Sequence, residues 1–334
     1  MVSAVIFVAT SCVSPLTGFA FWETNLAYEG ESICNYLQVK NLSDRTILST
    51  NVLFGVQSVT MKDKGLTGMY YDTALAAPAL ADNANSALIL GMGTGTYARQ
   101  LKQYYPKMNI TGVEIDQKIT DLAGEYFDEP ADIPVTTYDG RAWLAASHDK
   151  YDVIMVDAYQ DITIPFQMSS TEFFTMVREH LNPGGVMVVN MNMISDGQGS
   201  INEALSDTIA SVFGNGNTLT ADVPNTTNRE LFAKKPGSGS EENSMQQASK
   251  ALNLRETTYE RTGSEDLEWY MEEVASRFRK VNEPDSASTI LTDDKAPVEV
   301  LGMHAIDQII ADEAGPYRQI LKDEGFGGLL RAVQ

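Results

Sequence analysis

Between residues 86 and 235 the chain alternates between short apolar runs and stretches with helical periodicity. Five of the apolar runs are separated by four helical stretches, and the runs read SALILGM, NITGVEI, IPVTTYD, YDVIMVDA and GGVMVVNM. Alternation of this kind predicts βα units that form a parallel sheet wound with helices on both faces. Two later runs, NTLTADV and ELFAKK, extend the prediction to a mostly parallel, seven-stranded, Rossmann-like sheet. Ligands of such α/β sheets bind outside the carboxyl ends of the strands.

The remaining patterns divide the chain into four predicted parts. Alternating polar and apolar residues, punctuated by Asn, Asp and Gly, predict a small β-domain over residues 23–65. The Rossmann-like domain follows over residues 66–236 and opens with a helix over 67–81. A Gly- and Ser-rich linker at 234–244 then leads to a helical C-terminal extension over 245–334.

The first part, residues 1–22, is a hydrophobic leader, and residues 2–22 carry no charge. A segment of this length is long enough to cross a bilayer, so we expect a membrane-anchoring segment. A signal peptide usually begins with basic residues, which are absent here, and the same absence weighs against a lipoprotein signal that ends at Cys12. A buried or unstructured leader is the alternative.

Composition narrows the classes of ligand. The 334 residues carry a net charge of −21, which argues against a nucleic-acid partner because phosphates need a basic surface. The chain has two cysteines, which suggest no disulfide framework and favour a reducing compartment. It also has only three histidines and no metal-type spacing, so we expect no metal site.

The stretch LILGMGTGTYARQ predicts a strand, a glycine-rich turn and a helix start. Gly91, Gly93 and Gly95 give the pattern G-x-G-x-G, whereas a dinucleotide fingerprint needs a further glycine where Thr96 stands. A P-loop needs a Gly-Lys-Ser/Thr ending, which is also absent. The turn therefore favours a nucleoside ligand that has no pyrophosphate.

Acidic residues end the next three predicted strands. Glu114 can accept hydrogen bonds from ribose hydroxyls, as an acid does at this place in dinucleotide folds. Asp139, followed by Gly140, can accept from an adenine amino group or cap the helix that follows. Asp157 ends the predicted strand YDVIMVDA, which is read as buried on both faces, and we expect it to face the crevice.

Taken together, these motifs resemble the spermidine synthase (polyamine aminopropyltransferase) family, which is built on the class I S-adenosylmethionine-dependent methyltransferase fold. The resemblance rests on ILGMGTG, VEID, YDG, LNPGGVMVV and the loop DAYQDITIPFQMSSTEFF. ESICNYLQV resembles the small N-terminal β-domain of the family, and Tyr70-Tyr71-Asp72 resembles its helix start. The chain is most similar to the branch of the family that is fused to membrane helices, and the tail LTDDKAPVE resembles that branch.

The resemblance implies the roles of individual residues. Glu114 would hold the ribose of decarboxylated S-adenosylmethionine and Asp139 its adenine, and Asn35 stands where the family has a glutamine near the nucleoside. Asp157 would hold the donor's ammonium or help to deprotonate the attacking amine. Tyr70 and Asp72 would line the acceptor channel.

The chain departs from the family pattern at two acidic positions. Thr94 stands where the family has an aspartate that grips the donor's terminal amine. Gln160 stands where it has the aspartate that activates the acceptor amine, and Asp161, one place later, is the candidate to replace it.

Four functions follow from these residues. The first is a spermidine-synthase-like transferase that moves an aminopropyl group from decarboxylated S-adenosylmethionine to an amine such as putrescine and releases methylthioadenosine. The second is another S-adenosylmethionine-dependent transferase, since Thr94 in place of an aspartate would remove a repulsion toward a carboxylated donor. A non-catalytic nucleoside sensor attached to a membrane segment is the third, and an NAD enzyme, disfavoured by the missing glycine, is the fourth. The resemblance also implies a homodimer, and such a donor implies a cytoplasmic-facing domain.

Overall fold

The computed structural model of the chain describes residues 20, 23–51, 55–158, 164–192, 199–237, 245, 248–284, 288–304 and 322. The predicted leader, residues 1–22, lies outside the described residues except for Ala20. Among the residues described, no helix is both long and apolar enough to cross a membrane.

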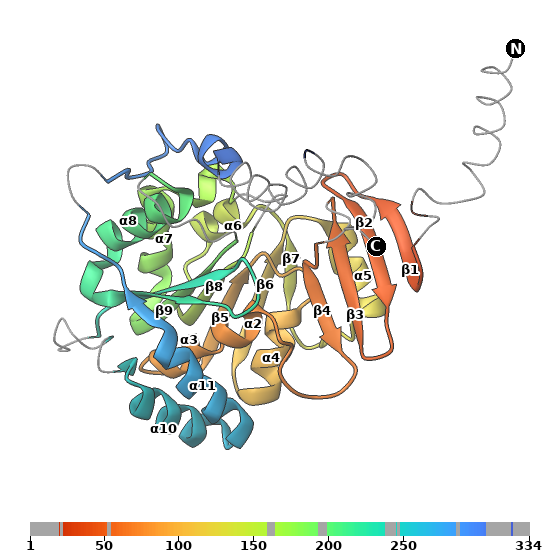
Figure 1. Ribbon diagram of the computed structural model, residues 1–334, viewed down its shortest axis with the longest axis horizontal. Helices are drawn as coiled ribbons and strands as arrows, with labels where there is room; N and C mark the ends of the chain where they lie inside the picture. Colours follow the sequence, from red (N-terminus) through yellow and green to blue (C-terminus); the bar gives the residue numbers. More distant parts are fainter. Residues whose placement is uncertain are drawn as a thin grey trace, which may run out of the picture.

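Two β-sheets organise the described chain (Figure 1). The N-terminal sheet is antiparallel throughout and runs in the order β1 (Leu26–Glu31), β2 (Tyr36–Asn41), β3 (Arg45–Thr50) and β4 (Ser58–Met61). The central sheet has eight strands within the described residues, in the order β12-β10-β11-β9-β8-β5-β6-β7. Its strands are β5 (Ser86–Leu90), β6 (Asn109–Glu114), β7 (Val135–Thr137), β8 (Tyr151–Val156), β9 (Leu181–Met191), β10 (Thr218–Asp222), β11 (Arg229–Lys234) and β12 (Phe278–Lys280).

The central sheet confirms the predicted fold class. Strands β9, β8, β5, β6 and β7 are parallel, and β11, β10 and β12 continue the sheet in antiparallel pairing. All six residues of β8 are buried, as expected for a strand with helices on both faces. The prediction had seven strands. The eighth is β12, which pairs with β10 after the chain returns from the C-terminal helices.

Helices cover both faces of the central sheet and form two separate apolar cores. On one face lie α2 (Tyr70–Ala74), α3 (Ala76–Leu80), α4 (Thr96–Tyr104), α10 (Ala251–Thr262) and α11 (Glu265–Arg277). On the other lie α6 (Gly140–Ala146), the 3-10 turn η1 (Phe166–Met168), α7 (Thr171–His180) and α8 (Ile201–Phe213), and the turn η2 (Asn215–Asn217) precedes β10.

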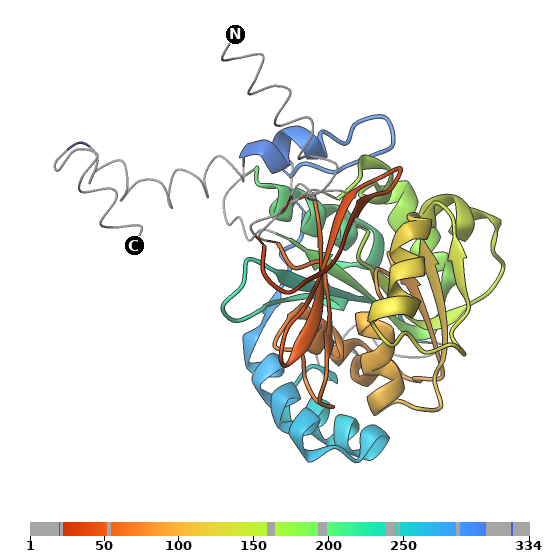
Figure 2. The same ribbon diagram turned by 90° about the vertical axis from the view of Figure 1, so that its right-hand side faces the viewer.

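The N-terminal sheet packs beside the central sheet through α5 (Gln117–Tyr126). Leu37, Val39 and Leu48 of the small sheet form one apolar cluster with Ile119 and Leu122 of α5. Figure 2 shows the small sheet from the side, standing against the edge of the molecule that carries α5. This packing brings the small sheet next to the carboxyl ends of the central strands.

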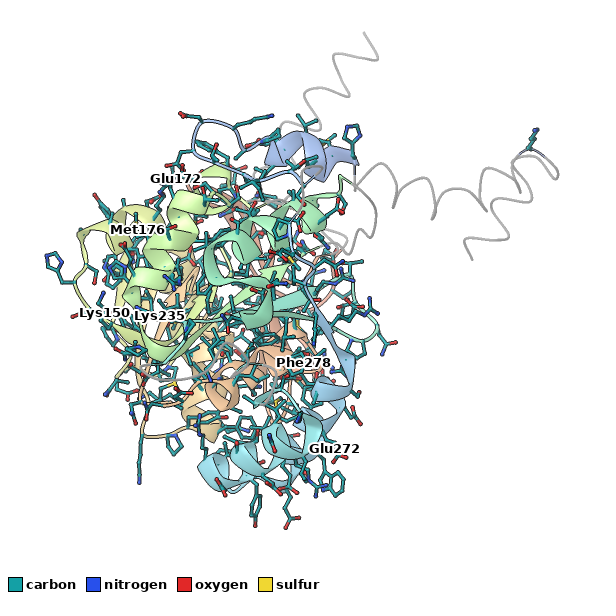
Figure 3. All side chains as sticks on the ribbon, turned by 90° about the vertical axis from the view of Figure 1, so that its left-hand side faces the viewer. Lys150, Glu172, Met176, Lys235, Glu272 and Phe278 are labelled. Atoms are coloured by element: carbon teal, nitrogen blue, oxygen red, sulfur yellow. The ribbon has the colours of Figure 1, made fainter. Side chains whose placement is uncertain are left out.

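The C-terminal part of the chain was predicted to be helical, and its described residues include helices α10 and α11, the strand β12 and further helical residues at 298–304. Helices α10 and α11 form a hairpin at the lower edge of the molecule, where α10 packs against α3 (Figure 1). In Figure 3 Phe278 lies at the junction between α11 and the sheet, and its ring centroid is 5.6 Å from that of Phe232 on β11. This aromatic contact fixes the turn from α11 into β12.

Candidate active site

The candidate site lies along the carboxyl ends of the parallel strands. In spatial order, Asp139 follows β7, Glu114 ends β6, the glycine turn follows β5, Asp157 follows β8 and Asn190 lies near the end of β9. The order of connection reverses at β5, with the next strand along the chain on one side and β8 on the other. A reversal of this kind opens a crevice above the sheet.

A pocket of about 340 Å³ occupies this crevice. Its lining includes residues from the strand ends and from the N-terminal sheet region: Cys34, Asn35, Leu48, Thr50, Gly55, Val56, Gln57, Ser58, Met69, Tyr70, Tyr71, Gly91, Gly93, Val113, Glu114, Ile115, Ile119, Tyr138, Asp139, Gly140, Asp157, Ala158, Pro165, Gln167, Met168, Asn190, Asn192, Thr227 and Asn228. Among these lining residues, three are carboxylates, and they lie on the two sides of β5.

The glycine turn allows the backbone of β5 to approach β8 closely. Gly91 has φ of 88°, and a Cβ atom at this position would lie 2.3 Å from the carbonyl oxygen of Asp157. Glycine is therefore required on two grounds, the left-handed backbone and the missing space. Gly93 follows, and its amide donates a 2.8 Å hydrogen bond to Oε2 of Glu114.

Glu114 is held by backbone amides on both sides. Oε1 accepts from the amide of Asp116 at 3.0 Å, while Oε2 accepts from Gly93. Burial is the largest influence on its pKa and raises it, whereas these two hydrogen bonds lower it. The carboxylate is thus fixed in place with acceptor capacity left toward the pocket.

Asn35 reaches the same end of the pocket from the N-terminal sheet. Its Nδ2 donates to Oδ2 of Asp116 at 2.9 Å, and its Oδ1 accepts from Nδ2 of Asn51 at 2.9 Å. Ser32 also donates to Oδ2 of Asp116, at 2.5 Å. Asp116 therefore joins the small sheet to the end of β6.

Asp139 caps the helix that follows it. Its Oδ1 accepts from the amide of Ala142 at 2.8 Å, which is the N-cap alternative stated above, and the residue also lines the pocket. Gly140 lies at the start of α6. Ile115 and Tyr138, each more than half exposed, lie beside Glu114 and Asp139 and offer apolar surface for a flat ring.

Asp157 forms the second polar centre, on the other side of β5. Oδ2 accepts from the hydroxyl of Tyr70 at 2.6 Å, and Oδ1 accepts from Nδ2 of Asn190 at 3.0 Å. Burial raises the pKa of Asp157 from 3.8 to about 6, and the two hydrogen bonds oppose that rise. A buried carboxylate of this kind is a stronger base than an exposed one.

A chain of short contacts extends from Asp157 toward the N-terminal sheet. The hydroxyl of Tyr70 lies 2.7 Å from that of Tyr71, and the hydroxyl of Tyr71 donates to the carbonyl oxygen of Gln57 at 2.7 Å. The contacts Asp157–Tyr70, Tyr70–Tyr71 and Tyr71–Gln57 share only two phenolic protons. While Asp157 is ionised, only two of the three contacts hold a proton, so the hydroxyl of Tyr70 donates either to Asp157 or to Tyr71.

Amide side chains surround this second centre. Oδ1 of Asn190 accepts from Nδ2 of Asn228 at 2.9 Å, and Gln57, Gln167 and Asn192 line the same pocket. The described residues at this end therefore offer one carboxylate among neutral hydrogen-bonding groups.

The structure brings most of the predicted site residues into one pocket. These are Tyr70, Gly91, Gly93, Glu114, Asp139, Gly140, Asp157 and Asn35. Asp161, and Gln160 before it, lie outside the described residues.

Three predicted residues are placed away from the pocket lining. Thr94 is fully buried, its Oγ1 has no hydrogen-bond partner within the described residues, and its amide donates to Oγ of Ser58 at 3.3 Å. Gly95 precedes α4 and lies beside Glu129. Asp72 is buried, and its carboxylate accepts from the amides of Thr67 and Gly68 at 2.9 and 2.6 Å, so it holds the turn that leads into α2.

Several lining residues were not singled out from the sequence. Asn190, Ile115 and Tyr138 adjoin the predicted strand ends, so the rule that ligands bind at strand ends could have found them. Gln57, Ser58 and Asn228 reach the pocket through packing of distant segments and carry no local signal. In the part of the chain that the structure describes, no group of three or more His, Cys, Asp and Glu side chains could hold a metal ion.

Comparisons with known proteins show the family of the chain. The sequence model of the spermine/spermidine synthase domain matches residues 69–235. A probable polyamine aminopropyl transferase of Bifidobacterium longum (strain NCC 2705) is 99% identical over 334 residues, which cover 100% of this chain and 75% of that protein. The polyamine aminopropyltransferase of Corynebacterium efficiens is 37% identical over 131 residues, which cover 36% of this chain and 25% of that protein.

Solved structures show the same fold. A probable spermidine synthase from Corynebacterium glutamicum matches with a TM-score of 0.56 at 21% identity and covers 80% of this chain and 99% of its own. A spermidine synthase in complex with the transition state analogue AdoDATO matches with a TM-score of 0.53 at 19% identity and covers 64% of this chain and 75% of its own. With its family match over residues 69–235 and its relative of 99% identity, the chain belongs to the spermine/spermidine synthase family.

Proposed function

We propose that the chain transfers an aminopropyl group from decarboxylated S-adenosylmethionine to an amine acceptor such as putrescine and releases methylthioadenosine. The observation that carries the proposal is the arrangement of Asp157, a buried carboxyl in contact with Tyr70 and Asn190, across the glycine turn from Glu114. Family membership and the 99% identical probable polyamine aminopropyl transferase support the same activity.

The nucleoside of the donor is proposed to lie on the β6 and β7 side of the pocket. Glu114, fixed by two backbone amides, accepts hydrogen bonds from the ribose hydroxyls. Asp139 accepts from the adenine amino group, and Ile115 and Tyr138 contact the ring faces. Gly91 and Gly93 line the same pocket, and a Cβ atom there would clash with the backbone of Asp157 or the hydroxyl of Ser58.

The reaction is proposed to take place at Asp157. The donor supplies an activated carbon beside a sulfonium; the new bond joins this carbon to the acceptor nitrogen as the bond to sulfur breaks. Only a neutral amine can attack, and Asp157 is placed to take the proton or to hold the ammonium that accompanies it. Tyr70 and Asn190 keep the carboxylate oriented for this task.

The test is turnover by the purified chain with decarboxylated S-adenosylmethionine and putrescine, followed as methylthioadenosine release. We expect Asp157→Asn to abolish turnover, whereas Asp149→Asn, at an exposed position before β8, leaves it unchanged. Undiminished turnover in Asp157→Asn would remove this carboxylate from the mechanism.

A transferase that uses the carboxylated donor is the second candidate, because the family aspartate is replaced by Thr94 and the side chain of Thr94 is buried away from the pocket lining. Calorimetric titration with both donors separates the two functions. Tighter binding of S-adenosylmethionine than of its decarboxylated form would favour the second, and binding of either without turnover across a panel of amines would favour a nucleoside sensor.

Three further proposals rest on the sequence. They are attachment to a membrane through residues 1–22, a cytoplasmic-facing domain and a homodimer. Fractionation of cells that express the full chain, and of a chain without residues 1–22, tests the first two, and light scattering of the purified chain tests the third.

A further inference from the structure

Glu230 is a buried carboxyl that the proposed reaction does not use. It lies in the middle of β11, and its exposed fraction is 0%. Neither Oε1 nor Oε2 has a hydrogen-bond partner within the described residues. An acid in this situation is unusual, because acidic side chains are almost never fully buried unless they are paired.

The register of the sheet places Glu230 beside the catalytic centre. Glu230 pairs with Asn190 across the antiparallel β9–β11 ladder, and residues opposite each other point to the same face of a sheet. Asn190 in turn donates to Asp157 at 3.0 Å. Asn190 therefore lies between Glu230 and Asp157, and Glu230 is on the side of Asp157 away from the glycine turn.

In the part of the chain that the structure describes, the groups around Glu230 provide no counterion. Asp157 faces it from the end of β8, Tyr70 and Tyr71 belong to α2, which packs on β11, and Tyr97 faces it from α4. Within the described residues, burial and the charge of Asp157 are the causes that act on the pKa of Glu230, and both raise it. Two carboxyls held close together cannot readily both be ionised, so their protons leave in separate steps.

We propose that Glu230 is a positioning residue that acts through Asp157: it holds a proton while the pocket is free and releases that proton when a cationic amine binds at Asp157. The released proton goes to solvent, and no covalent bond changes. This inference rests on the proposed function, because it assigns the cation to the amine substrates of the same pocket.

The release of a proton from Glu230 suits the positive charge of the proposed substrates. The donor carries a sulfonium and an ammonium, and a diamine acceptor adds further positive charge, whereas the described lining residues near Asp157 include no second carboxylate. An ammonium in a buried site is costly without an anionic partner. Ionisation of Glu230 supplies the second negative charge only when the cation is present, so the free pocket avoids two adjacent buried charges.

The test measures the protonated carboxyl directly by infrared difference spectroscopy. At pH 7 the free protein is expected to show the C=O band of a protonated carboxylic acid that is missing from Glu230→Gln. Putrescine, added with saturating methylthioadenosine so that no turnover occurs, should remove this band. Absence of the band from the free wild-type protein, or its persistence with putrescine bound, would overturn the proposal.

The pH dependence of binding provides the second measurement. Between pH 7 and pH 8 the affinity of the wild type for putrescine, measured by calorimetry, should rise by up to about tenfold, because one proton is released on binding. Glu230→Gln should lose this dependence, and the control Glu203→Gln, an exposed acid in the first turn of α8, should keep it. Equal slopes in the wild type and Glu230→Gln would contradict the proposal.

Failure of the proposed function gives a different result. Absence of putrescine binding would refute the amine substrate. The infrared band of the free protein needs no ligand, so it decides separately whether Glu230 holds the proton. If the role of Glu230 were purely structural, Glu230→Gln would change the stability of the chain. It would alter neither the infrared band nor the pH dependence of putrescine binding.

Discussion

The ionised carboxylate of Asp157 should lower the free energy of unfolding at neutral pH, and this decrease can be measured. Burial raises the pKa of Asp157 from 3.8 to about 6 in the folded chain. One unit of pKa corresponds to about 1.4 kcal/mol, so ionisation of this group destabilises the fold by about 3 kcal/mol at pH 7. The folded state binds more protons than the unfolded state between these two pKa values, and stability therefore falls as pH rises through that window.

Replacement of Asp157 by Asn removes this dependence. The difference in the free energy of unfolding, variant minus parent, should be about 2 kcal/mol larger at pH 7 than at pH 4. At pH 4 Asp157 of the folded parent is still protonated, so most of the destabilisation by its charge is absent. An Asn side chain loses one of the two acceptor contacts to Tyr70 and Asn190, but that loss is the same at both pH values and cancels. Both proteins carry Glu230→Gln, so that the neighbouring carboxyl does not titrate.

The assay is urea unfolding followed by far-UV circular dichroism at pH 4 and at pH 7, from which the free energy of unfolding is obtained. A stability difference between variant and parent that is equal at the two pH values would refute the reasoning. It would mean that Asp157 has the same pKa in the folded and the unfolded chain.

Three further outcomes follow from the geometry. Glu114→Ala should weaken binding of methylthioadenosine by about 10-fold to 100-fold in calorimetry, because it removes charged hydrogen bonds of about 1.5–3 kcal/mol, and unchanged affinity would contradict the ribose role. Gly91→Ala should lower the melting temperature markedly, since its Cβ would lie 2.3 Å from the carbonyl oxygen of Asp157. The control Gly124→Ala, in α5 with no atom within 4 Å of its Cβ, should stabilise the chain by about 0.5–1 kcal/mol. Similar melting temperatures for the two variants would contradict the close approach. Glu230→Met should raise the free energy of unfolding by about 1–3 kcal/mol, because it replaces an unpaired buried carboxyl with an apolar side chain of similar size; a loss of stability would show that the carboxyl has a partner.

The parallel part of the sheet could be predicted because its signal is local. The strands β5, β6 and β8 are mainly apolar runs that end in or are followed by a glycine or an acid, and the backbone geometry carries Gly91, Glu114 and Asp157 to the same edge. Each strand and the residue that follows or ends it are neighbours in sequence, so the inference needs no contact between distant segments. For the same reason the turn at Gly91 could be recognised before its contact with β8 was known.

Other features depend on contacts between distant segments, and local patterns do not reveal them. Phe278–Lys280 follow a helix directly, and they form a strand only because the edge of β10 is available to pair with them. Thr94 follows a pocket residue in sequence, but its side chain is fully buried, and its backbone amide donates to Oγ of Ser58. The apolar neighbours of Glu230 in ELFAKK identify a strand, while the face on which Glu230 lies depends on the order of the strands.

The contact chain from Asp157 through Tyr70 and Tyr71 to Gln57 joins the segment that matches the family to the part of the chain before it. Residues 69–235 match the family, and Gln57 and the N-terminal sheet lie before that segment. The carboxyl of Asp157 lies inside the matched segment, whereas the part of the pocket wall to which it connects lies before that segment. A chimera that takes its N-terminal sheet from a relative would therefore change the pocket wall near Gln57 and leave the carboxyl of Asp157 in place.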